Sequence, residues 1–231
     1  MVTLVTIADS NVTAAVALDD WLKDTLTAFP GIVRSVAARE LLMAAREFYQ
    51  RSFAWQHTIE EQNLVAGRVR YRLLITNTYA DVVGVLGVAL NGVWMPAAAG
   101  RPIPPSPDND DTADQPSLWY IGDPPDGVEL FPDPSIADTG ALSFRVALTV
   151  RESSTTLPRL ASQVHYEPIM DGFLARVYAH PRKPYSSPND SAMRRRKFNA
   201  AVAEWRGQVK QGYAQAQNWR FPSGWGVFRR V

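Results

Sequence analysis

The hydrophobic period of this chain changes twice, and this change restricts the fold more than any other feature of the sequence. Apolar residues recur at helical spacing up to about Ser52, then give way to short β-rich runs between Trp55 and Val150, and return to helical spacing from about Leu157. The sequence therefore predicts an α+β fold, in which a bundle of N- and C-terminal helices flanks an inserted, sandwich-like antiparallel β region. The expected organisation is a helical domain of residues 1–55 and 157–217, a β-rich insert of residues 56–156 and an extended tail of residues 218–231.

Helix boundaries follow from apolar stripes and from residues that favour helix ends. Pro30 should end the first helix, and Pro181 should end the third, whose first turn holds Pro168. Ser187 followed by Pro188 resembles an N-cap with proline at the first helical position, so the last helix should begin there. The expected helices cover about residues 17–29, 33–52, 167–180 and 188–217. The side chains expected in their core include Phe48, Phe173, Phe198 and Trp205.

Strands are expected in the middle of the chain. The pair Asn91-Gly92 lies between two apolar runs and predicts a hairpin, because both residues tolerate the positive φ of a type I′ turn. Ten of the seventeen prolines fall between Pro96 and Pro134. Because proline cannot donate a hydrogen bond to a neighbouring strand, this Pro/Asp-rich segment must be rich in loops. The expected strand-forming runs are residues 64–75, 82–95, 118–122, 128–131 and 142–150.

Composition excludes several kinds of site. The chain has no cysteine, which excludes disulfides, thiolate nucleophiles and cysteine-ligated metals. Its three histidines, His57, His165 and His180, lack the spacing that places two metal ligands on one helix face. No apolar run reaches the roughly 18 residues of a membrane helix, and no signal peptide is evident. We therefore expect an intracellular product with no cofactor, no metal site and no membrane contact.

The segment from His165 to Tyr185 invites a catalytic interpretation, because it places a histidine close to Glu167 and Asp171. However, no nucleophile is evident, and His165 should lie outside the helix or at its cap. Glu167 and Asp171 are better interpreted as acids in the first turn of a helix, where the helix dipole favours them. Nucleophile-elbow, phosphate-loop, zinc-protease and dinucleotide motifs are also absent from the sequence. We therefore expect a protein that is not an enzyme and has no catalytic residues.

Charge is strongly segregated along the sequence, although the formal net charge is only +1. Residues 96–140 carry nine acidic residues against one basic residue, whereas residues 176–231 carry twelve basic residues against two acidic ones. Such asymmetry favours contacts between subunits or with a charged partner. The candidates for inter-subunit charge contacts are Asp108, Asp110, Asp111, Arg194, Arg195, Arg196 and Lys197.

Both charged clusters have other interpretations. The aspartates from Asp108 to Asp111 resemble part of a calcium loop, but the glycine and terminal glutamate of an EF-hand are missing, which favours a solvated loop. The basic run from Arg194 to Lys197 is a candidate for phosphate contacts. Because its charges fan around a helix, a solvated face or an acidic protein partner is equally consistent with it.

The last fourteen residues, NWRFPSGWGVFRRV, combine four large aromatic residues with three arginines. One proline and two glycines argue against a helix in this tail. Aromatic and arginine side chains dominate binding hot spots, so we expect the tail to dock on a partner. The residues expected to bind that partner are Trp219, Arg220, Phe221, Trp225, Phe228, Arg229 and Arg230.

Two segments carry a resemblance to a known family. The segment FPGIVRSVAARELLMAAREFYQRSFAWQ contains Ala-Ala-Arg-Glu-Phe at residues 44–48, followed by Ser52 and Trp55. The second segment contains, in order, Leu157-Pro158, His165-Tyr166-Glu167, Ile169, Gly172, Leu174-Ala175-Arg176, Lys183-Pro184-Tyr185, Phe198 and Val202. Together with the intervening β segments, these residues resemble the head-to-tail connector (adaptor) proteins of tailed bacteriophages over about residues 29–217.

This resemblance implies a virion structural protein. Such a connector is expected to form a closed ring, a dodecamer, that binds beneath the portal, joins the capsid to the tail and lines the channel for genomic DNA. The implied partners are the portal protein, a tail or tail-tube protein and further copies of the chain, with no sequence-specific DNA binding. The implied location is the head-tail junction of the virion, after synthesis in the host cytoplasm.

Two other functions stay open on the sequence alone. A tail or baseplate component that binds or hydrolyses glycans would need a groove with exposed aromatic residues and paired carboxylates. A nucleic-acid-binding protein would bind DNA as a monomer, with an affinity that falls steeply as salt rises.

Overall fold

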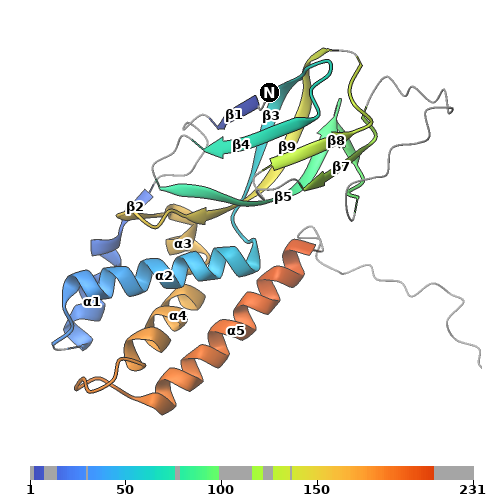
Figure 1. Cartoon of the computed structure of the whole chain (residues 1–231). Helices are drawn as coiled ribbons and strands as arrows, with labels where there is room; N and C mark the ends of the chain where they lie inside the picture. The colour runs from blue at the N-terminus through green and yellow to red at the C-terminus, as the bar shows by residue number, and fades with distance from the viewer. Residues whose placement is uncertain are drawn as a thin grey trace, which may run out of the picture.

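The computed structural model describes residues 3–7, 15–29, 31–75, 79–98, 116–121, 127–135 and 137–210 of the chain. These residues form a helical bundle that lies beside a region of stacked β-sheets (Figure 1). The α+β class expected from the sequence is therefore confirmed.

Helix α2 lies at the centre of the bundle. On one side it contacts β9, where Thr149 Oγ1 donates a hydrogen bond of 3.2 Å to the carbonyl of Arg46. On its other side it packs against α4 and α5, and α1 lies beside its N-terminal end (Figure 1). The described helices are α1 (Leu18–Ala28), α2 (Arg34–Ser52), α3 (Arg159–Gln163), α4 (Tyr166–Tyr178) and α5 (Pro188–Lys210).

The four longer helices confirm the helices expected from the sequence. Pro188 is the first residue of α5, and the preceding Ser187 Oγ accepts a hydrogen bond of 3.5 Å from the N–H of Asp190. Pro168 lies in the first turn of α4 as expected, but Asp171 does not, because α4 begins at Tyr166. The expected extension of the last helix to about Gln217 lies outside the described residues.

The strands form two four-stranded sheets and one small pair. The orders are β1-β4-β8-β7, β3-β9-β5-β6 and β10-β2. Every pairing given for these strands is antiparallel except that of β1 with β4, which is parallel and departs from the antiparallel expectation. The strands are β1 (Thr3–Ile7), β2 (Ala15–Ala17), β3 (Gln56–Leu64), β4 (Arg70–Ile75), β5 (Ala80–Leu90), β6 (Val93–Met95), β7 (Leu118–Ile121), β8 (Gly127–Phe131), β9 (Asp138–Val150) and β10 (Thr156–Pro158).

The hairpin expected at Asn91-Gly92 is confirmed. These two residues connect β5 to its antiparallel partner β6, and their φ angles are 50° and 79°. Positive φ at both positions gives the turn a twist that matches that of the strands it joins.

The two larger sheets face each other and enclose apolar side chains. Tyr71 of β4 and Phe144 of β9 are fully buried, and their ring centres lie 5.9 Å apart across the two sheets. Trp119 of β7 donates its indole N–H to the carbonyl of Met95 at 3.0 Å, which connects the two sheets at their edges. Strand β9 continues beyond this sandwich toward α2, so one strand belongs to the core of both regions (Figure 1).

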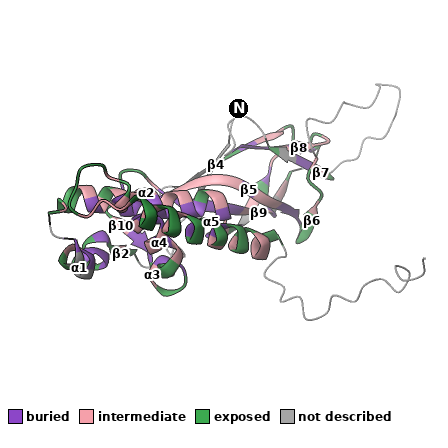
Figure 2. Cartoon of the chain, turned by 90° about the horizontal axis from the view of Figure 1, so that it is seen from below, coloured by how far each residue is buried: buried purple, intermediate pink, exposed green. Residues whose placement is uncertain are grey.

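The core of the bundle contains three of the four aromatic residues expected there. Phe48, Phe173 and Phe198 are fully buried, whereas Trp205 is only partly buried. Gly172 allows α4 to approach α5 closely, because a Cβ atom at this position would lie 2.7 Å from the Phe198 ring. Figure 2 shows the buried residues on the inner sides of the helices and exposed residues along α5.

Candidate interaction surfaces

The basic run from Arg194 to Lys197 lies near the start of α5, and the helix divides its side chains between two faces. Arg194 Nη1 lies 2.6 Å from Asp171 Oδ1 of α4, and Arg195 forms an ion pair with Glu47 of α2. The next two side chains, Arg196 and Lys197, are exposed. In this run, therefore, only Arg196 and Lys197 face solvent without a carboxylate partner among the described residues.

Glu47 connects three helices of the bundle. Its carboxylate accepts hydrogen bonds from Arg51 of its own helix at 2.8 Å, from Arg176 of α4 at 2.9 Å and from Arg195 of α5 at 2.9 Å. Burial raises the pKa of Glu47, but the three guanidinium groups outweigh this effect and lower the pKa to about 2. Two of the arginines also lie over the Phe198 ring, at 5.8 and 5.1 Å. This cluster therefore fixes the positions of α2, α4 and α5.

The side chains of His165, Glu167 and Asp171 do not converge. His165 is 1% exposed, its Nδ1 lies 3.1 Å from the Tyr49 hydroxyl, and its ring lies 4.5 Å from that of Trp205 in an edge-to-face arrangement. Burial lowers the pKa of His165 to about 4, which keeps the ring neutral at neutral pH. Glu167 is exposed, and Asp171 pairs with Arg194. The histidine is therefore part of an aromatic packing cluster.

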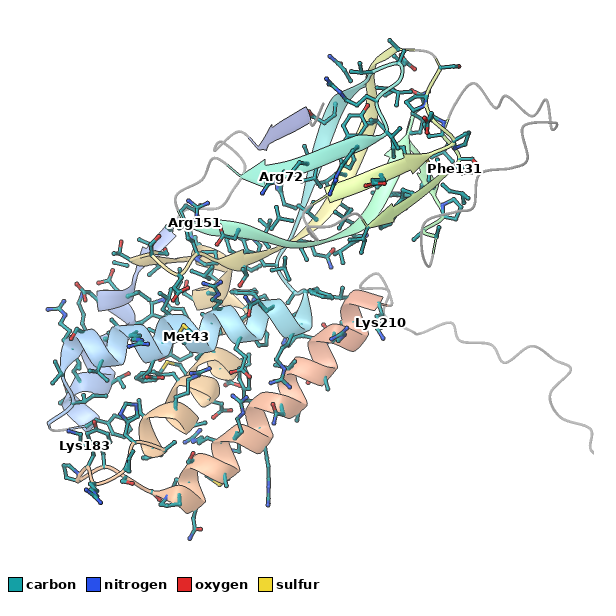
Figure 3. All side chains as sticks on the ribbon, viewed as in Figure 1. Met43, Arg72, Phe131, Arg151, Lys183 and Lys210 are labelled. Atoms are coloured by element: carbon teal, nitrogen blue, oxygen red, sulfur yellow. The ribbon has the colours of Figure 1, made fainter. Side chains whose placement is uncertain are left out.

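A groove opens where the end of α5 meets the sheet that contains β3, β9 and β5. It is open to solvent on one side and has a volume of about 440 Å³. Figure 3 labels Lys210 at this end of α5, close to the point where α2 passes into β3. The residues that line the groove are Phe53, Gln56, Leu86, Arg145, Arg206, Val209 and Lys210.

Three basic side chains line this groove, which we call the basic groove. Arg145 Nε donates a hydrogen bond of 2.8 Å to Gln56 Oε1. Arg206 lies over the Phe53 ring with its Cζ atom 5.2 Å from the ring centre, and its Nη1 donates to the carbonyl of Arg51 at 3.3 Å. Lys210 is exposed. Sequence reasoning missed this site because its residues come from four separate segments, and only the basic residues of the last helix gave a signal.

Exposed apolar side chains gather on the edge strands β6 and β7. Val93, Trp94 and Ile121 are exposed to 70%, 53% and 52% respectively. The Trp94 ring lies over Gly87, where a Cβ atom would come within 2.9 Å of it. Exposed apolar side chains that gather on one part of a surface are typical of contact surfaces.

The other predicted site residues lie outside the described part of the chain. They belong to the Pro/Asp-rich segment and to the C-terminal tail. They are Asp108, Asp110, Asp111, Trp219, Arg220, Phe221, Trp225, Phe228, Arg229 and Arg230.

Two further features are absent from the described residues. Within them, no group of three or more histidine, cysteine, aspartate or glutamate side chains is arranged to hold a metal ion. Among the described helices, none combines the length and the apolar character that crossing a membrane requires.

Comparison with protein-family models gives a match to the family described as SU10 adaptor protein, over residues 10–222. The match covers most of the chain and includes both segments that resemble phage connector proteins. It confirms that resemblance. No curated protein matches the sequence at a significant level.

Proposed function

Because the chain belongs to the SU10 adaptor protein family, we propose that it is a structural adaptor of the phage virion. Identical subunits form a ring that binds beneath the portal and joins the capsid to the tail. The observation that carries this proposal is the family match over residues 10–222. In this role the protein needs no cofactor and no catalytic residue, and genomic DNA passes through the channel without sequence-specific binding.

Two features of the subunit support assembly through defined surfaces. The Glu47 cluster joins three helices, so the bundle can act as one rigid body. Charges without a carboxylate partner among the described residues, on Arg196 and Lys197, lie on a different element from the exposed apolar side chains of Val93 and Trp94. Different surfaces on one subunit suit a heterologous contact, in which each copy presents one face to the preceding copy and another to the next.

The proposed partners are the portal, a tail or tail-tube protein and further copies of the chain. The aromatic and arginine residues of the C-terminal tail, residues 218–231, are proposed to bind the portal, because such side chains supply most of the free energy at protein interfaces. The protein is proposed to be made in the host cytoplasm and to reach its final place at the head-tail junction.

Electron microscopy of the purified protein, alone and mixed with the portal, tests this function. We expect a ring of twelve copies on the tail-facing end of the portal. A protein that leaves the portal bare at every concentration contradicts the proposal. Specific glycan binding in a parallel assay would favour a tail component, and tight DNA binding by the monomer with a steep salt slope would favour a nucleic-acid-binding protein.

Salt dependence gives a second test of the charge contacts. Exposed charges are screened beyond about 8 Å at physiological ionic strength, so raising salt should slow ring assembly or loosen the ring. Light scattering of the assembling ring measures this effect. Assembly that is indifferent to salt would show that the charge segregation has no part in the contact.

A further inference from the structure

We propose that the basic groove binds the acidic segment of a second copy of this chain, residues 102–116. This inference rests on the proposed assembly of the chain with copies of itself. The basic groove is the receptor surface and residues 102–116 are the ligand, in place of a general attraction between acidic and basic regions.

The charges of the groove call for an anionic ligand. Arg145, Arg206 and Lys210 line one small groove, and none of them forms an ion pair with a carboxylate among the described residues. By contrast, Arg176 and Arg195 in the bundle meet the carboxylate of Glu47. Three positive charges that converge without a counter-charge repel one another, and a carboxylate ligand removes that repulsion.

The apolar part of the groove argues for a peptide. Phe53, Leu86 and Val209 are all half-buried and line the groove beside the basic side chains. A phosphate backbone would contact the basic residues and leave these apolar side chains exposed. A peptide that carries both carboxylates and apolar side chains would cover both parts of the groove.

The segment PIPPSPDNDDTADQP, residues 102–116, has this chemistry. It contains four aspartates, five prolines, one isoleucine and no basic residue. Proline-rich peptides lose little conformational entropy when they bind, because their backbone is already restricted. Its aspartates can meet the basic side chains while its proline and isoleucine side chains meet the apolar ones.

The C-terminal residues 211–231 are a poorer occupant, although they follow Lys210 directly. They contain three arginines and no aspartate or glutamate, so they would add positive charge to a groove that is already positive. A ligand on a second copy also suits a ring. A groove on each subunit that takes a segment of the next subunit gives a contact with a direction, and such contacts repeat until the ring closes.

A fluorescent synthetic peptide of residues 102–116, added to the purified protein, tests whether the groove recognises this segment. We expect saturable binding by fluorescence anisotropy that weakens as salt rises. Lys210→Glu should weaken it about tenfold, the equivalent of roughly 1.4 kcal/mol. Lys183→Glu is the matched control, because Lys183, in the turn between α4 and α5, is an exposed lysine that does not line the groove.

A second peptide, in which asparagine replaces all four aspartates, tests the role of charge. It should bind at least tenfold more weakly than the natural sequence. Equal binding of the two peptides, or no binding of either one, overturns the proposal. Equal effects of Lys183→Glu and Lys210→Glu would also overturn it, because binding would then depend on overall charge and not on the groove.

Mixing two variants tests whether the contact joins different copies. One variant carries Lys210→Glu, and the other carries asparagine at all four aspartates of the segment. Each should self-associate less than the natural protein in light scattering after gel filtration. Their mixture should form heterodimers, because one intact groove meets one intact segment. A mixture that stays monomeric while the natural peptide binds overturns the proposal, since the segment would then occupy the groove of its own chain.

These assays contain no portal, so a failure of peptide binding to the groove can be distinguished from a failure of the proposed portal attachment. Normal attachment to the portal without peptide binding would refute the groove alone. Peptide binding without attachment to the portal would refute the proposed function and leave the groove as a contact between copies.

Discussion

Replacing Gly172 of α4 with alanine should destabilise the protein, although alanine is the better helix former. A Cβ atom built at Gly172 lies 2.7 Å from two carbons of the Phe198 ring and 3.3 Å from Ala44 Cβ. The ring cannot move aside easily, because Phe198 is fully buried and lies under the guanidinium groups of Arg51 and Arg195. The added methyl group must therefore push α4 away from α5.

Two opposing effects decide how much Gly172→Ala changes the free energy of unfolding. Glycine to alanine inside a helix gains roughly 1 kcal/mol from backbone entropy. Overpacking a well-packed core costs about 1–3 kcal/mol. Because two contacts fall well below the van der Waals distance and a third is tight, we take the upper end of this range. The net expectation is a loss of about 2 kcal/mol, or about 4–8 °C in Tm for a chain of this size.

Urea denaturation followed by far-UV circular dichroism measures the free energy of unfolding. The matched control is Gly207→Ala in α5, where an added Cβ atom meets no atom within 4 Å and should stabilise the helix by up to about 1 kcal/mol. Combining Gly172→Ala with Phe198→Leu should cost less than the sum of the two single changes, because the smaller side chain relieves the clash. If Gly172→Ala stabilises the protein as much as Gly207→Ala does, the close approach of α4 and α5 is refuted.

Three other predictions follow from the bundle and the tail. The low pKa of Glu47, about 2 against an ordinary 4.5, means that its contribution to stability is complete above pH 5 and is lost as pH falls toward 2. The free energy of unfolding of the natural protein should therefore exceed that of Glu47→Gln by about 2–3 kcal/mol at pH 7, and this difference should vanish near pH 2; a difference that is constant with pH would contradict the ion-pair cluster. Phe198→Ala should cost about 3–5 kcal/mol, whereas Glu204→Ala on the exposed side of the same helix should cost little, and equal thermal shifts would reverse the assigned inner face. Removing residues 219–231 should leave the melting temperature nearly unchanged and sharply reduce the fraction of portal sites filled in electron micrographs; a truncated protein that fills every site would refute the role of the tail.

The helices could be predicted because their signals are local. Ser187 and Pro188 mark the start of α5 within two adjacent residues, and the apolar stripe of α2 lies within one stretch of sequence. The hairpin at Asn91-Gly92 is equally local, since the turn conformation depends on these two residues. Such elements need no knowledge of the rest of the fold.

The missed strands depend on distant pairings. In β3 the register with β9 shifts on both sides of Gln62, so the buried residues Ile59 and Leu64 do not follow a simple alternation. Strand β1 pairs in parallel with β4, more than sixty residues away. Parallel strands are not joined by a short turn, so the sequence gives no local signal from which this pairing could be predicted.

The contacts of the candidate site residues also depend on distant parts of the chain, so the sequence could not predict them. The basic run from Arg194 to Lys197 was expected to spread around its helix, but only the structure shows that Arg194 and Arg195 meet carboxylates of other helices. The sequence alone did not predict that Arg145 belongs to the basic groove. Its neighbour Gln56 lies on another strand, far away in the sequence. Residues that act together from separate elements can be grouped only when the elements are placed in space.

The chain passes from α2 into the β region at Phe53. This residue follows α2 directly and has a φ of 58°, a left-handed conformation that costs roughly 1–2 kcal/mol in a residue other than glycine. Its neighbours offset this cost, since its N–H donates to the carbonyl of Tyr49 at 3.0 Å and its ring lies against the guanidinium of Arg206. Because Arg206 belongs to α5, the last helix helps to fix the direction in which the chain passes from α2 into β3.

An acidic ligand in the basic groove would act at the same connection. Arg206 uses Nη1 for the carbonyl of Arg51, and a guanidinium has five N–H donors, so it can bind a carboxylate without releasing that carbonyl. Filling the groove would therefore restrict Arg206 further and hold the ring of Phe53 more firmly in place. We expect slower amide exchange at Phe53 when the peptide of residues 102–116 is bound, and unchanged exchange with its asparagine variant.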